Sequence, residues 1–173
     1  EVERGARLRP HVVQSPYQVR LHAERTLLRL ATLRNRLWGA YVEAPLRQFA
    51  TPRVPHPVDA DLGGMVRLLG YDAGPSEVRS GEEVHVRLYW RARAPIAQSY
   101  TVFVHLLDRQ EQVRGQHDGI PGQGTRPTDT WVTGEVIIDE VQFAVAPETP
   151  PGPHRIEVGL YLAATGARLP VFD

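Results

Sequence analysis

Acidic, histidine and hydroxyl side chains gather in and beside the loop 118–130, where they could bind a ligand. His117 and Asp118 lie at the start of this loop, and Thr128 and Asp129 lie near its end. Oxygen ligands in a loop are the type that Ca²⁺ prefers. The spacing matches no EF-hand loop, however, and Asp and Thr in such loops more often stabilise turns. We therefore expect turn stabilisation here and no metal site.

No group of residues in the sequence is typical of an enzyme active site. The seven histidines occur singly, without the spacing of a zinc site. The sequence has no cysteine, no G-x-S-x-G nucleophile motif and no phosphate-binding loop. Pairs of carboxylates occur, but any domain with this many acidic residues contains such pairs. We expect no catalytic residues and no cofactor.

Four side chains on the strand faces opposite the expected core could form a binding surface. Aromatic residues on an open sheet face suit stacking against sugar rings or contact with a protein partner. Alternatively, a helix predicted over 16–41 covers this face, which we favour because a large exposed apolar patch promotes aggregation. The four residues are Tyr89, Phe103, His105 and Tyr161.

Two residues of the segment that follows the long loop are expected to be structural. Trp131 is expected to close one end of the fold. Asp139 is expected to fix the loop by accepting backbone or arginine hydrogen bonds, since a buried carboxylate needs such partners.

These side chains are positioned by strands whose sequence alternates between apolar and polar residues. The runs 83–92 and 100–108 have this period of two, and further strands are expected at 65–71, 112–116, 135–145, 154–162 and 168–171. The link 93–99 is short for a helix, so the two central strands are expected to pair antiparallel. The pattern predicts an all-β fold, an antiparallel Ig-like or jelly-roll sandwich of about seven to eight strands. The predicted core is Val86, Leu88, Trp90, Val102, Val104, Val141, Phe143, Ile156, Val158 and Leu160.

The N-terminal segment differs from the rest in charge and pattern. Residues 1–53 carry ten Arg against four Glu, about +6, whereas residues 54–173 carry ten Arg against sixteen acids, about −6. Apolar residues at helical spacing predict an amphipathic helix over 16–41. Three prolines between 50 and 57 predict a stiff linker. We therefore divide the chain into a basic segment, 1–57, and a β-sandwich domain, 58–173. Docking of the basic segment on the acidic domain is favoured over contact with a membrane surface.

A series of short motifs occurs in order through residues 58–173. The series includes LLGYD at 68–72, YTVFVHLLD at 100–108, QHDG at 116–119 and TGARLP at 165–170. In this order the motifs resemble the soluble C-terminal region of multi-spanning bacterial glycosyltransferases, the dolichyl-phosphate-mannose mannosyltransferase-like group. The resemblance implies an extracytoplasmic accessory domain, at the cell surface or its periplasmic equivalent. It implies no catalytic residues, because the chemistry of such proteins is assigned to their membrane part.

Two functions are consistent with these observations. The first is a non-catalytic accessory domain of a membrane glycosyltransferase-like protein, with glycan binding as its role and an upstream segment as its membrane tether. The alternative is an Ig-like protein-interaction module of a secreted or surface protein. The expected partner is a polysaccharide or a protein and not a nucleic acid. Several apolar spans upstream of Glu1 would favour the first function, and a signal peptide there would favour the second.

Overall fold

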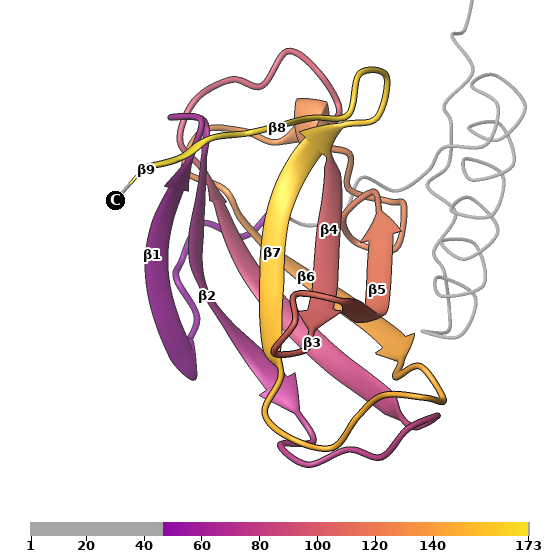
Figure 1. Ribbon diagram of the computed structural model, residues 1–173. Helices are drawn as coiled ribbons and strands as arrows, with labels where there is room; N and C mark the ends of the chain where they lie inside the picture. The colour runs from indigo at the N-terminus through magenta and orange to yellow at the C-terminus, as the bar shows by residue number, and fades with distance from the viewer. Residues whose placement is uncertain (1–46, 173) are drawn as a thin grey trace, which may run out of the picture. The chain divides into compact units, whose positions relative to one another are not determined.

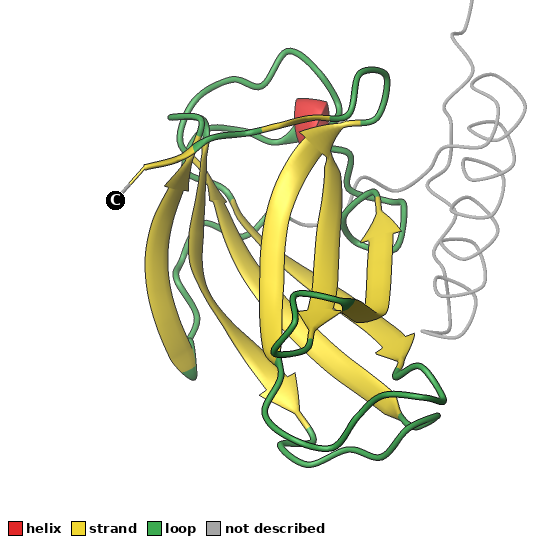
Figure 2. Ribbon diagram, viewed as in Figure 1, coloured by secondary structure: helices red, strands yellow, loops and turns green. Residues whose placement is uncertain are grey.

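The structure, a computed structural model, describes residues 47–172, which form two antiparallel β-sheets packed against each other (Figures 1 and 2). The five-stranded sheet has the order β6-β3-β2-β1-β9, and the four-stranded sheet has the order β5-β4-β7-β8. This confirms the predicted all-β sandwich, whereas the helix predicted over 16–41 lies outside the described residues. The strands are β1 (His56–Leu62), β2 (Val66–Gly74), β3 (Glu83–Ala92), β4 (Thr101–Leu107), β5 (Val113–Gly119), β6 (Val136–Ala144), β7 (Arg155–Leu162), β8 (Ala167–Arg168) and β9 (Val171–Phe172).

The period-two pattern places one face of each central strand in the core. In β3, Val86, Leu88 and Trp90 are buried, while Arg87 on the other face is exposed. The predicted core residues are buried except Ile156 and Val158, which are half-buried against the core. Additional buried apolar residues complete the core: Leu62, Val66, Leu68, Val84, Ala92, Ile96, Leu106, Trp131, Ile137 and Val145.

The predicted pairing of the two central strands is wrong. Strand β3 pairs with β2 and β6, and β4 pairs with β5 and β7 in the other sheet. The link 93–99 therefore crosses from one sheet to the other instead of forming a hairpin. Ile96 in this link is buried in the core. Strands β3 and β4 each have one apolar face. Placing the two strands in facing sheets buries these faces against each other, whereas pairing the strands within one sheet would not.

The two lateral sides of the sandwich are joined differently. On the side of β5 and β6, the sheets approach closely, and the amide of Ala146 donates to the carbonyl of Arg114 at 2.6 Å. On the other side, the chain passes from β8 to β9 and joins the sheets at one end only (Figure 1). There Leu169 N–H donates to the carbonyl of Leu160, and Gly63 N–H donates to the carbonyl of Pro170. The inner faces of β1 and β7 are consequently left apart along this side.

Two contacts of the sandwich involve residues before 58, its predicted first residue. Gln48 forms an isolated bridge with Val136 at the start of β6. Strand β1 begins at His56, within the proline-rich stretch, and pairs with β2. No helix within residues 47–172 is long and apolar enough to cross a membrane.

Candidate functional site

The four candidate residues of the long loop do not converge on one point. His117 and Asp118 are consecutive on β5, so their side chains lie on opposite faces of the four-stranded sheet. Thr128 is fully buried; its hydroxyl donates to the carbonyl of Gln98 and accepts from the amide of Tyr100. Within the described part of the chain, no group of three or more His, Cys, Asp or Glu side chains is arranged to hold a metal ion. Asp129 is exposed in the short 3₁₀ helix Thr128–Thr130.

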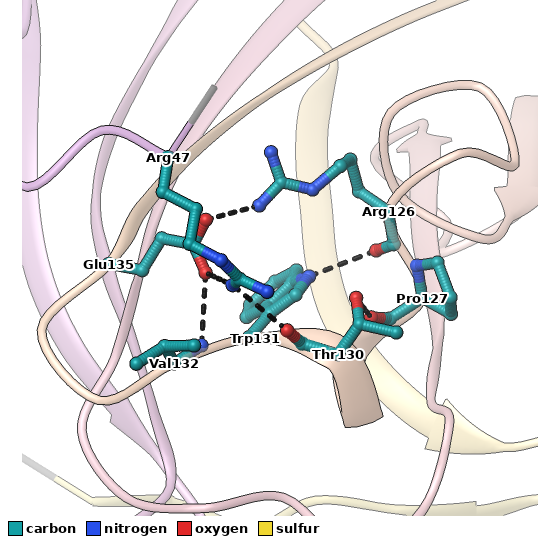
Figure 3. Close-up of polar contacts among 7 residues, drawn as sticks. All are labelled: Arg47, Arg126, Pro127, Thr130, Trp131, Val132 and Glu135. Carbon is teal, nitrogen blue, oxygen red and sulfur yellow. Dashed lines mark hydrogen bonds and ion pairs between the residues drawn. The ribbon is translucent and has the colours of Figure 1, made fainter. Parts of the chain in front are cut away.

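The end of the loop is anchored by Glu135, a fully buried carboxylate that sequence reasoning did not single out (Figure 3). Its Oε2 accepts from Arg47 at 2.6 Å and from the amide of Val132 at 2.9 Å, and its Oε1 accepts from Arg126. Trp131 is buried beside this cluster, and its Nε1 donates to the carbonyl of Arg126 at 2.9 Å. The buried charge is thus paired twice, and the cluster holds the loop in place.

The start of the loop is held by Asp139 on the inner face of β6. Its Oδ1 accepts from the amide of Gly122 at 2.8 Å. Among residues 47–172, the buried Oδ2 of Asp139 and the buried Nε1 of Trp90 form no hydrogen bond of standard geometry. Burial raises the pKa of the Asp139 carboxyl, and the Gly122 hydrogen bond, the nearby His117 and the Trp90 side chain oppose this increase. The contacts of Glu135 and Asp139 thus tie down the two ends of the loop.

The four candidates for a glycan surface lie on two different sheets. Tyr89 is on the outer face of the five-stranded sheet and is 4% exposed. Phe103, His105 and Tyr161 share the outer face of the four-stranded sheet, where their strands β4 and β7 are neighbours. The structure therefore brings three of the four together.

The Phe103 ring is covered by its neighbours. It lies over Gly159, where an added Cβ would come within 2.5 Å of the ring. The Arg168 guanidinium lies 4.3 Å from the ring centroid on the outer face. The rings of His105 and Tyr161 lie 4.9 Å and 6.2 Å from that of Phe103. Phe103 is 4% exposed as a result, so His105 and Tyr161 are the accessible members of this group.

His105 is flanked by carboxylates on both neighbouring strands. Its Nε2 lies 3.7 Å from Asp118 on β5, and its Nδ1 lies 3.6 Å from Glu157 on β7. Asp118, proposed from the loop, thus joins the residues proposed from the aromatic pattern. The side chains of this group are partly exposed to solvent.

A cavity lies elsewhere, between the two sheets on the side of β1 and β7. Its volume is about 1170 Å³. Drug-sized ligands are typically bound in clefts of roughly 300–1,000 Å³, lined mostly by apolar side chains. Ile156 and Val158 line this cleft, which explains why they are only half-buried. The apolar residues with accessible surface in this cleft are Val58, Ala60, Ala73, Ile156, Val158 and Val171. Beneath them lie the buried core residues Leu62, Leu68, Val84, Val86, Leu88 and Leu106.

Sequence reasoning did not identify the cleft. The period-two pattern predicts which side chains face inward but not how far apart the facing sheets lie. The proline-rich loop 149–154 borders the cleft and ends just before β7, but its composition does not indicate a cleft.

No family model, curated protein or solved structure matches the chain.

Proposed function

We propose that the β-sandwich is a non-catalytic binding module and that the cleft between its sheets holds an apolar ligand. The observation that carries this proposal is the cleft itself, with a volume of about 1170 Å³ and walls of aliphatic side chains from both sheets. A cavity of this size leaves apolar surface without packing partners, and a ligand would supply them.

The test uses N-phenyl-1-naphthylamine, an uncharged probe that fluoresces in apolar surroundings. Ala73 lies on the inner face of β2 and lines the cleft, so Ala73→Phe should fill it. Ala144 is exposed on the outer face of β6, so Ala144→Phe adds the same ring away from the cleft. We expect the unsubstituted chain and Ala144→Phe to bind the probe alike, and Ala73→Phe to lose binding.

A second variant that fills the cleft distinguishes loss of the cleft from misfolding of a single variant. Ile156→Trp fills the cleft from the opposite wall, on β7. Circular dichroism and thermal unfolding show which variants are folded. Equal probe binding by folded Ala73→Phe and Ile156→Trp would contradict the proposal, as would no binding by the unsubstituted chain.

A second candidate function is glycan binding on the outer face of the four-stranded sheet. It is favoured by the position of His105 between Asp118 and Glu157, beside Tyr161. Carboxylates and a half-buried aromatic ring suit the hydroxyl groups and the apolar face of a sugar. Titration with bacterial polysaccharides tests this function, and Tyr161→Ala should abolish any binding while leaving probe binding in the cleft unchanged.

The family resemblance supports a wider proposal about context. On that basis the module is an extracytoplasmic accessory domain of a membrane glycosyltransferase-like protein, with an Ig-like interaction module of a surface protein as the alternative. The reading frame upstream of Glu1 separates the two. Several apolar spans there would support the first, and a signal peptide there would support the second.

A further inference from the structure

The polar side chains of the cleft are confined to one end of it. They come from the loop 75–80, the loop 149–154 and the first residues of β1 and β7, all at the lower end of the sandwich in Figure 1. The rest of the cleft is lined by aliphatic side chains, apart from Tyr71, which stacks on His56. This segregation suits a ligand with an apolar body and one polar end rather than a plain hydrocarbon. The polar residues at this mouth are His56, Ser76, Glu77, Arg79, Ser80, Thr149, His154 and Arg155.

Arg79 is the cation of the mouth that is available to a ligand. Arg155 forms an ion pair with Glu111 across the exposed surface. Arg79 uses its backbone amide to donate to Glu82, and its guanidinium pairs with no carboxylate within residues 47–172. Ser80 donates to the carbonyl of Thr149, which ties the two loops of the mouth together. A planar guanidinium binds a carboxylate in bidentate geometry, which makes Arg79 suited to an anionic head group.

The length of the cleft is set by the strands that line it. Strand β1 has seven residues, from His56 at the mouth to Leu62 at the opposite end. At about 3.3 Å per residue, this row of inward side chains spans roughly 20 Å. That distance is comparable to the extended length of a long-chain fatty acid.

We propose that the ligand of the cleft is an anionic amphiphile, a long-chain carboxylate. Its hydrocarbon chain lies between β1 and β7, and its carboxylate lies at the mouth, bound by Arg79. This inference rests on the proposed function, since it assigns a ligand class to the same cleft.

The test is displacement of N-phenyl-1-naphthylamine from the full chain by three compounds of equal chain length. Tetradecanoate, tetradecanol and tetradecylamine are compared below the concentrations at which they form micelles. We expect tetradecanoate to displace the probe at a concentration about tenfold lower than tetradecanol, because it gains a charge-assisted hydrogen bond. Tetradecylamine should be the weakest competitor.

A matched pair of arginine variants locates the head group. Arg79→Gln should make tetradecanoate and tetradecanol equally effective. Arg87 is exposed on the outer face of β3, away from the cleft, so Arg87→Gln should keep the preference for tetradecanoate. Loss of the preference in both variants, or in neither, would overturn the assignment of Arg79.

The outcomes for the inference and for the proposed function differ. If the probe binds and all three compounds displace it equally, the proposal of an anionic ligand is overturned, while the proposal that the cleft binds an apolar ligand stands. Absence of probe binding overturns the proposed function itself. Sedimentation at several protein concentrations adds a further outcome. A dimer that Ala73→Phe converts to a monomer, without displacement by tetradecanoate, would show that a second copy of the chain covers the cleft and would overturn the inference.

Discussion

Asp139 occupies a position on β6 that alternation assigns to the core, between Ile137 and Val141. Burial raises the pKa of its carboxyl group above the usual value for Asp. In the unfolded chain the group titrates normally, so between the two pKa values the folded chain holds a proton that the unfolded chain has lost. Its contribution to stability is therefore greatest at low pH and is lost as the pH rises through the folded pKa.

The substitution Asp139→Asn tests the direction of this pH dependence of stability. The amide keeps an oxygen to accept the hydrogen bond from Gly122 and cannot ionise. We expect the variant to gain stability relative to the unsubstituted chain as the pH rises from about 4, the ordinary pKa of Asp, toward neutrality. The measurement is urea unfolding across this range of pH. A difference in stability that stays constant with pH would show that the carboxyl group is not perturbed by burial.

At the scale of elements, the long connection between β5 and β6 is held by buried carboxylates as well as by the packing of Trp131 in the core. Glu135 secures its end through Arg126 and Arg47, and Asp139 secures its start through Gly122. Sequence reasoning expected Trp131 and Asp139 to be structural, but it could not identify Glu135. The reason is that Arg47 is 88 residues away along the chain, so no local spacing indicates the pair.

The two arginines that bind Glu135 should differ in their effect on stability. The Arg126 side chain is 14% exposed, whereas that of Arg47 is 42% exposed. Removing one partner of a buried ion pair costs about 3–5 kcal/mol, and exposed pairs contribute about 1 kcal/mol or less. We expect Arg126→Ala to lower the free energy of unfolding by more than Arg47→Ala, with faster amide exchange in residues 119–134. Similar losses for both variants would mean that the exposure of each arginine does not determine how much it contributes.

For the whole molecule, the cleft predicts that core truncations on one strand have unequal effects. Leu160 and Ile156 lie on the inner face of β7; Leu160 is fully buried, and Ile156 lines the cleft. Leu160→Ala should cost roughly 2–5 kcal/mol, as truncation in a packed core does. Ile156→Ala should cost about 1 kcal/mol or less, because fewer packing contacts are lost. Equal losses in chemical unfolding would show that the cleft is closed in solution.

The alternation of side chains fixed the faces of the strands, which is why the predicted core residues of β3, β4 and β6 are all buried. This property is local, because successive side chains of a strand point to opposite sides whatever the strand pairs with. The residues Phe103, His105 and Tyr161 were likewise placed on an outward face by the same rule.

The tertiary structure decided which strands pair and where the sheets separate. The link 93–99 could have closed a hairpin, but crossing between the sheets buries Ile96 and the apolar faces of both β3 and β4. The cleft arises because the segment 167–172 joins the sheets at one end only, which leaves β1 and β7 apart. The separation of two facing sheets depends on connections distant in sequence, so no period or spacing along a single strand specifies it.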